Sequence, residues 1–173
     1  MLLTVNVLET ERLSLRQLKT EDAAFILELL NEPSFLTNIG DRGVRTLEDA
    51  SQYILKGPVD SYERHGYGFW LVELKSERVP IGICGLVRRD VLPGTDIGYA
   101  FLPRYWSRGY AYESAAAVLN YARDVLGLKR LLAIVNRDNT GSIKVLEKLG
   151  LKYERMVRVS PDAPEIALYA ADL

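Results

Sequence analysis

The stretch from Phe101 to Ala122, FLPRYWSRGYAYESAAAVLNYA, carries the most informative spacing in the chain. A short apolar segment runs into a turn, and Gly109 of that turn directly precedes an alanine-rich pattern typical of a helix. A helix start offers about four unpaired backbone N–H groups and a partial positive charge, which favour a bound phosphate. Gly109 lets a bulky ligand approach the backbone, and Arg104 and Arg108 add charged donors. The sequence therefore indicates a pyrophosphate site at this turn.

Other phosphate-binding motifs do not account for the turn. The chain contains neither the G-x-x-x-x-G-K-[ST] loop nor the G-x-G-x-x-G fingerprint, which disfavours a P-loop or dinucleotide-binding domain. On local chemistry alone, an ordinary helix start with two surface arginines explains the same residues. The elements around the turn are needed to choose between these interpretations.

Hydrophobic periodicity predicts strands and helices interleaved in one α/β or α+β domain. Helical patterns cover 19–32, 45–58, roughly 110–126 and 138–150, with a possible short turn over 60–64. Strands are expected over 11–18, 67–74, 81–87, 95–102, 130–136, 151–159 and 165–173. The helix limits follow from capping and stop signals: Thr20 and Thr46 as caps, and Pro33, Gly57-Pro58, Gly127 and Gly150 at the ends.

Composition excludes several classes of protein. The chain of 173 residues has a formal net charge of −1, which argues against bulk neutralisation of nucleic-acid phosphates. It has one cysteine, Cys84, and one histidine, His65, so we expect neither a disulfide within the chain nor a cysteine or histidine metal site. The N-terminus lacks a signal-peptide pattern and no apolar run approaches the roughly 20 residues of a membrane span. We therefore expect a cytoplasmic protein without a membrane partner.

Several motifs, in order over about residues 8–172, resemble the GCN5-related N-acetyltransferase (GNAT) family. Residues Trp106 to Ala111 resemble its R/Q-x-x-G-x-G/A phosphate motif, with Trp first, as in the subgroup of Rim-type ribosomal-protein N-terminal acetyltransferases. LETERLSLRQL resembles the opening strand of that subgroup, IGICGL its hairpin and DIGYAF its acidic-I-G-Y strand. NRDNTGSIKVLEKLGLKYE resembles its N-x-x-N-x-x-S tail. Ser107, Leu151 and Arg155 depart from the subgroup pattern.

The resemblance implies a fold, a domain and a cosubstrate. The fold would be a central mixed, mostly antiparallel sheet of about six or seven strands, splayed in the middle, with about four helices on both faces. One N-acetyltransferase domain would span 8–173 and use acetyl-coenzyme A, without a metal. The splayed strand would offer the backbone of Phe101 and Leu102 to the pantetheine arm. The further cofactor contacts that the resemblance implies are Arg104, Trp106, Ser107, Arg108, Gly109, Tyr110, Ala111, Asn136, Asn139 and Ser142.

Acetyl transfer to an amine needs a base, a polarised carbonyl and a stabilised leaving thiolate. Asp96 is the candidate base, although a carboxylate at a strand edge explains it too. Glu113 lies in the first turn of the central helix, where a favourable interaction with the helix dipole is the preferred reading. Many family members place an acidic tyrosine at the position of Leu146, so the resemblance assigns that role to Ser142, whose alternative is local backbone bonding.

The preferred function is acetyl transfer to a primary amine by direct attack in a ternary complex. The acceptor is either a protein N-terminal α-amine, as in the Rim-type enzymes, or a small-molecule amine. Trp70 and Tyr99 are expected to face the acceptor cleft. The alternatives are a coenzyme A-binding regulatory module without turnover, suggested by Leu146, and a nucleotide-binding α/β domain. We expect no direct nucleic-acid partner and a monomer or homodimer.

Overall fold

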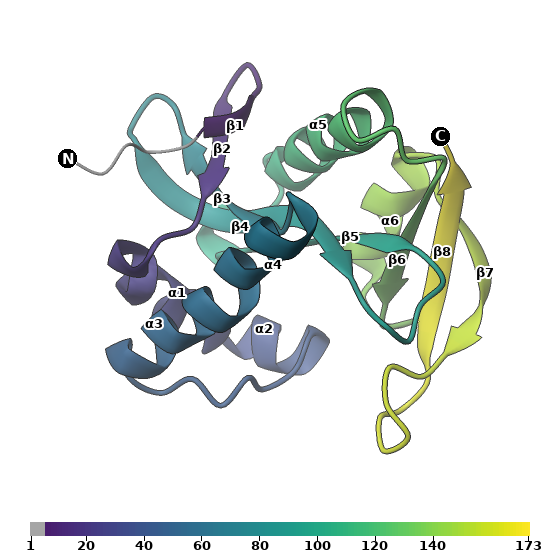
Figure 1. Cartoon of the computed structure of the whole chain (residues 1–173), viewed down its shortest axis with the longest axis horizontal. Coiled ribbons are helices and arrows are strands. Elements are labelled where there is room, and N and C mark those ends of the chain that lie inside the picture. Colours follow the sequence, from purple (N-terminus) through teal and green to yellow (C-terminus); the bar gives the residue numbers. More distant parts are fainter. Residues whose placement is uncertain (1–5) are drawn as a thin grey trace.

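The computed structural model describes residues 6–173, which form an eight-stranded sheet in the order β1-β2-β3-β4-β5-β6-β8-β7 (Figure 1). The predicted mixed, mostly antiparallel sheet is confirmed, with one short N-terminal strand that the sequence did not suggest. The strands are β1 (Asn6–Glu9), β2 (Leu13–Gln17), β3 (Phe69–Leu74), β4 (Val79–Arg88), β5 (Thr95–Phe101), β6 (Arg130–Val135), β7 (Lys152–Val157) and β8 (Ile166–Asp172).

Strands β5 and β6 meet at one point and then separate. They are parallel, and their register consists of Asp96 opposite Leu132. By contrast, β4 and β5 pair over the whole of β5, from Arg88 opposite Thr95 to Gly82 opposite Phe101. The expected splay is therefore present, and its apex lies at the N-terminal end of β5.

Helices cover both faces of the sheet, as predicted (Figure 1). Helices α5 and α6 pack on one face, where the main hydrophobic cluster lies, whereas α1 and α3 pack on the other over a second cluster. Each face of the splayed gap is thus bordered by its own helical layer. The helices are α1 (Ala23–Leu30), α2 (Pro33–Asn38), α3 (Leu47–Ile54), α4 (Asp60–His65), α5 (Tyr110–Asp124) and α6 (Thr140–Lys148).

Two helix boundaries differ from the sequence prediction. Thr20 is not a cap but the first residue of a 3-10 turn, and the Asp22 carboxylate accepts the Lys19 N–H at 3.0 Å instead. Gly57-Pro58 does not stop the helix. A wide turn over Leu55–Val59 joins α3 to α4, and this wider turn accommodates a proline that has no N–H to donate.

A buried ion pair fixes the α1 end of the molecule to the sheet. The Arg16 guanidinium donates to both Asp22 carboxylate oxygens, at 2.8 and 2.7 Å, and its Nε donates to Glu73 at 2.8 Å. Arg16 and Asp22 are each 8% exposed. This network joins β2, β3 and the turn before α1, so it orients the helical layer on that face.

We expect Asp22→Asn to destabilise the fold by about 1.5–3 kcal/mol, because it removes the carboxylate that two guanidinium N–H groups of buried Arg16 bind and leaves Glu73 as its acid partner. The measurement is the urea-unfolding midpoint at unchanged m-value. Asp41→Asn is the matched control, since Asp41 pairs with Arg45 at an exposed site and should change the midpoint little. Equal shifts in the two variants would contradict this role.

Candidate functional site

The backbone of β5 presents unpaired groups to the splayed gap. The Leu102 N–H donates to the Ile81 C=O at 3.0 Å, which fixes the alternation of the β4–β5 ladder. Ala100 and Leu102 therefore point their backbone groups at β4, whereas those of Tyr99 and Phe101 point at the side of β6. Because β6 has already diverged there, these groups border the gap.

Because of this alternation, the residues whose backbone groups can bind a ligand differ from the predicted pair, Phe101 and Leu102. Both backbone groups of Leu102 are used within the protein, since its C=O accepts the Tyr105 N–H at 2.9 Å. The Phe101 C=O accepts the Trp106 indole N–H at 2.8 Å. The Leu102 part of the prediction is therefore corrected: Tyr99, together with the Phe101 N–H, provides the groups that face the gap.

The turn before α5 has the geometry of an anion cradle. Ser107 and Gly109 have positive φ values of 61° and 83°, and α5 begins at Tyr110. Within residues 6–173, no acceptor takes the backbone N–H groups from Ser107 to Ala111. Successive unpaired N–H groups at the positive end of a 15-residue helix favour a phosphate-sized anion.

Arg12, from the distant N-terminal end of the chain, lies against this turn. Its Nη1 donates to the Arg108 C=O at 3.0 Å, and its guanidinium lies 4.4 Å from the centre of the Tyr110 ring. Its Nε donates to Glu113 at 2.7 Å, and Glu113 also accepts the Thr10 hydroxyl at 2.6 Å. Glu113 thus fastens the β1–β2 turn to α5. No local sequence signal places Arg12 here.

The two predicted arginines of the turn have different surroundings. Arg104 donates to Glu28 of α1 at 2.7 Å, so its charge already has a partner. Arg108 makes no ion pair within the described residues and lies 5.9 Å from the Tyr105 ring centre. Of the pair, Arg108 is the one whose charge is available to a ligand.

Helix α6 borders the other side of the gap. The Ser142 hydroxyl donates to Tyr99 Oη at 2.9 Å, and that phenol donates to the Ser142 C=O at 3.0 Å. Burial raises the pKa of Tyr99 to about 12. Asn139 caps α6 by accepting the Ser142 N–H at 3.3 Å. Asn136 instead donates to the Asn38 C=O at 2.7 Å and holds the end of β6 against α2.

Asp96 lies at the apex of the gap, on the face opposite Tyr99. The side chains of Thr95 and Ile97 point toward the α5 side of the sheet, where the Thr95 hydroxyl bonds to the Tyr67 hydroxyl at 2.9 Å. Because side chains alternate along a strand, Asp96 points toward the α1 and α3 side. Asp96 is 1% exposed and contacts Arg89 Nε at 3.2 Å. Burial raises the pKa of Asp96 to about 6, while the Arg89 charge lowers it. Arg89 was not singled out from the sequence.

Trp70 corrects a sequence prediction. The residue is 1% exposed and packs edge-to-face on Tyr121 of α5, at 5.5 Å between ring centres. It is therefore part of the core and not a wall of the acceptor cleft. Leu146 is also buried in this core, and Cys84 is fully buried, which raises the pKa of its thiol to about 12.

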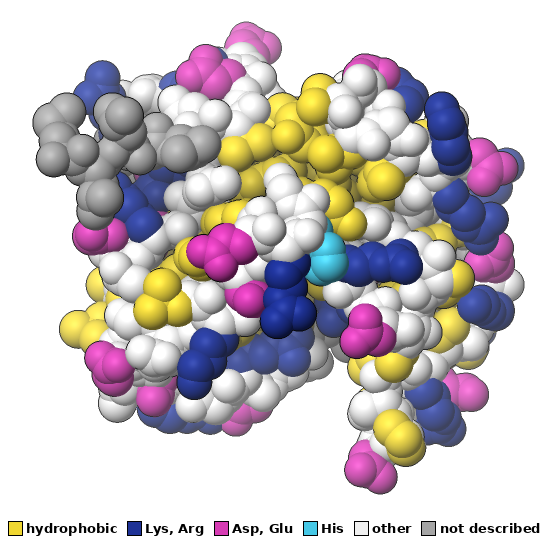
Figure 2. Space-filling view, in the orientation of Figure 1, with side chains coloured by type: hydrophobic (Ala, Val, Ile, Leu, Met, Phe, Trp, Pro, Cys, Tyr) yellow, Lys and Arg dark blue, Asp and Glu magenta, His cyan; other side chains and the backbone are white. Residues whose placement is uncertain are grey.

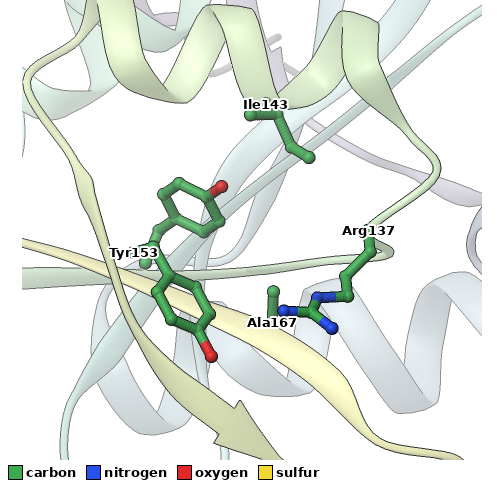
Figure 3. A pocket seen from close by; sticks show the side chains of 5 residues that line it. Arg137, Ile143, Tyr153 and Ala167 are labelled. Atoms are coloured by element: carbon green, nitrogen blue, oxygen red, sulfur yellow. The ribbon is translucent and has the colours of Figure 1, made fainter.

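One hollow lies on the α6 side of the sheet and another on the α3 side. One of about 210 Å³ lies between α6 and the β7–β8 pair, where Figure 3 shows Arg137 reaching toward Ala167 beneath Ile143. The other, of about 440 Å³, lies between the α2–α3 connection and α3, and its lining includes Arg42 and Tyr53. Figure 2 shows a notch at the lower centre, between the α1–α3 region and the strands to its right.

Two classes of site are absent from the part of the chain that the structure describes. Over 6–173, no group of three or more His, Cys, Asp or Glu side chains is arranged to hold a metal ion. In the same range, every helix is too short or too polar to traverse a lipid bilayer.

Comparison with known proteins gives a consistent match. The family model described as "Acetyltransferase (GNAT) domain" matches residues 12–152. The chain is 30% identical over 153 residues to the uncharacterized N-acetyltransferase YoaA of Bacillus subtilis, covering 88% of this chain and 86% of YoaA. It is 27% identical over 141 residues to the spermidine N(1)-acetyltransferase of Escherichia coli K12, covering 81% of this chain and 73% of that enzyme.

Solved structures show the same fold. An acetyltransferase from Agrobacterium tumefaciens superposes with a TM-score of 0.81 at 24% identity, covering 99% of this chain and 95% of the other. RimL, the ribosomal L7/L12 alpha-N-protein acetyltransferase, in complex with coenzyme A, superposes with a TM-score of 0.82 at 15% identity, covering 97% and 98%. At these sequence identities, the similarity to the solved structures shows the fold and nothing further.

The Asp96 carboxyl should titrate near pH 6 in carboxyl-carbon NMR of the native protein. Arg89→Gln should raise that pKa further, because the cation that favours the ionised carboxylate is removed. The exposed neighbour Arg88 is the control, and Arg88→Gln should leave the titration in place. An Asp96 pKa near the usual value of about 3.9 would contradict the buried geometry.

Proposed function

This chain belongs to the acetyltransferase (GNAT) family and is an acyltransferase, and we propose that it transfers the acetyl group of acetyl-coenzyme A to a primary amine. The amine attacks the thioester directly in a ternary complex. One observation carries the proposal. The unpaired backbone groups of Tyr99 and the unpaired Phe101 N–H lead from the β5–β6 apex to a turn with five unaccepted N–H groups, Ser107 to Ala111.

The residues of this chain fit a diphosphate with an extended thiol arm. The N–H groups from Ser107 to Ala111 hold the diphosphate oxygens, and Arg12 and Arg108 supply nearby positive charge. The backbone of Tyr99 and the Phe101 N–H bind the amide-bearing arm as a neighbouring strand would. When bound, acetyl-coenzyme A supplies an activated acyl thioester. Ser142 lies beside the same gap, through its bond to Tyr99.

Asp96 is the proposed base. With a pKa of about 6 its carboxyl is mostly ionised at pH 7, and it is a stronger base than an ordinary aspartate. It accepts the proton that the amine nitrogen loses as the nitrogen–carbon bond forms. A backbone N–H of β5 polarises the carbonyl oxygen.

Tyr99 and Ser142 stabilise the leaving thiolate as the carbon–sulfur bond breaks: the Ser142 hydroxyl, which donates to Tyr99 Oη in the unliganded protein, turns to donate to the sulfur, and Tyr99 keeps its bond to the Ser142 C=O. The Tyr99 pKa of about 12 lies above that of an ordinary thiol, about 8.5. The pair therefore stabilises the sulfur by hydrogen bonding and does not transfer its own proton. The thiolate takes its proton from water or from protonated Asp96. The two functions lie on opposite faces of the sheet, so the amine and the sulfur approach the gap from different sides.

The acceptor is a protein N-terminal α-amine or a small-molecule amine. At pH 7 an α-amine with a pKa of about 8 is roughly one-tenth neutral, whereas a lysine amine near 10.4 is less than a thousandth neutral. Obtaining the neutral amine at pH 7 therefore costs about 3 kcal/mol less for an α-amine than for a lysine. A modest base is enough for an α-amine for this reason. A free-thiol assay with acetyl-coenzyme A and a mixture of amines tests the activity. Tight coenzyme A binding without amine-dependent thiol release would favour a regulatory module instead.

Gly109→Glu should weaken acetyl-coenzyme A binding about 100-fold or more, because a carboxylate then stands among the phosphate-binding N–H groups. Isothermal calorimetry measures the affinity. Gly127→Glu is the matched control: Gly127 also has a positive φ, 69° against 83°, but lies away from the turn. The two variants should lose similar stability. Equal affinities would remove the cofactor from this turn.

Asp96→Asn should lower kcat/KM about 100-fold and abolish the rise in rate through about pH 6, because the deprotonated carboxylate is the active form. Asp90→Asn, which changes a nearby exposed carboxylate, should retain the wild-type profile.

Ser142→Ala should lower kcat about 10-fold with acetyl-coenzyme A affinity unchanged. An unaltered kcat in Ser142→Ala would remove Ser142 from the mechanism.

A further inference from the structure

We propose that the amine acceptor also carries an anionic oxygen group, a carboxylate or phosphate, which binds Arg42 and Lys56 while its amine reaches Asp96. This inference rests on the proposed function, because it concerns the acceptor side of the same site. Its basis is the hollow beneath helix α3.

The hollow is open, and two cations line it. Its volume of about 440 Å³ is large enough for one end of a small acceptor. Arg42 from the α2–α3 connection and Lys56 from the turn after α3 line it, together with Gln52 and Tyr53. Figure 2 shows further Lys and Arg side chains on this face of the molecule.

The hollow lies on the acceptor side of the gap. Asn136 at the end of β6 donates to the Asn38 C=O at 2.7 Å, which fixes the start of the α2–α3 connection beside the diverging strand. Asp96 also points to this face, whereas Tyr99 and Ser142 lie on the other. An amine bound from this side therefore meets Asp96 before it meets the thiol-binding pair.

Tyr53 connects the hollow to the base. It lines the hollow and packs against the core cluster under α1 and α3. Burial raises the pKa of the Tyr53 phenol, and the charges of Arg42 and Arg89 both lower it. Arg89 in turn contacts Asp96 at 3.2 Å. The charges of Arg42 in the hollow and of Arg89 beside Asp96 thus both act on the same phenol.

The hollow keeps a net positive charge, because its lining holds two cations, Arg42 and Lys56, and one acid, Asp49. Its lining acid, Asp49, accepts the backbone N–H groups of Arg45 and Thr46 at 3.0 and 3.1 Å, so its carboxylate is committed to the start of α3. Arg42 and Lys56 form no ion pair within residues 6–173, whereas neighbouring Arg45 pairs with Asp41. A purely cationic polyamine meets repulsion here, and an anionic group finds two donors.

The test compares acceptors that differ only in their distal group. With acetyl-coenzyme A saturating, thiol release is measured for ω-amino carboxylates of increasing chain length, their ω-amino carboxamides, ω-aminoalkyl phosphates and spermidine. At the best chain length, kcat/KM for an anionic acceptor should exceed that of its carboxamide about 10-fold, because an ionic contact is gained. The carboxylate and phosphate arms then identify which anion is preferred.

The double variant Arg42→Gln/Lys56→Gln should remove the preference for the anion, so that kcat/KM for the carboxylate falls about 10-fold relative to its carboxamide. Lys19→Gln/Arg78→Gln, which removes two cations elsewhere, should keep the preference. Equal rates for carboxylate and carboxamide, or a preference for spermidine, would overturn this inference while leaving acetyl transfer intact.

A binding measurement separates this inference from the proposed function. Calorimetric titration of the ω-amino carboxylates and carboxamides, with coenzyme A present, reports affinity without turnover. Carboxylate-selective binding that the double variant loses supports the anion site even if no amine releases thiol, an outcome that would overturn the proposed function alone. Unselective binding, or no binding, overturns the anion site.

Discussion

The divergence of β5 from β6 is the constraint on which the candidate site depends. A sheet normally pairs the backbone groups of neighbouring strands, and unpaired buried groups are costly. Here the two strands share the single register position of Asp96 and Leu132, so the later part of β5 has donors and acceptors directed at a partner that has moved away. Such groups are satisfied by water or by a strand-like ligand. The gap is therefore the weakest join in the sheet, and under our proposal it is the feature that binds the extended arm of the cosubstrate.

The gap persists because contacts outside the sheet hold its two sides. Asn136 ties the end of β6 to α2, and the Tyr99–Ser142 exchange ties β5 to α6. Farther away, Arg16 orients the α1 layer through its buried ion pair. These polar contacts are few and directional, so they define the position of the strands better than apolar packing alone does.

The splay also separates two chemical environments by the thickness of one sheet. On the α1 and α3 side, Asp96 is buried beside Arg89, and its carboxyl binds a proton more readily than usual. On the α5 and α6 side, Tyr99 is a buried phenol that holds its proton. A base and a hydrogen-bond donor therefore border the same gap without neutralising one another. That arrangement suits a reaction in which one proton is removed while negative charge develops elsewhere.

Local pattern was enough to predict much of this protein. The period of apolar residues gave the main strands and helices, Thr46 was correctly identified as a cap, and Gly109 marked the turn where φ is positive. It failed where local rules were overridden: the helix continues past Pro58 through a wide turn, and Trp70 packs in the core.

Other features were decided only by the tertiary structure. Arg12 lies against the turn before α5, Arg89 beside Asp96, and Tyr99 pairs with Ser142. These contacts join residues distant in sequence or depend on which way a strand faces. Spacing along the chain determines the conformation of neighbouring residues, because backbone sterics and side-chain period act over a few positions. Spacing along the chain does not predict contacts across the sheet, because these contacts depend on how the packed layers meet.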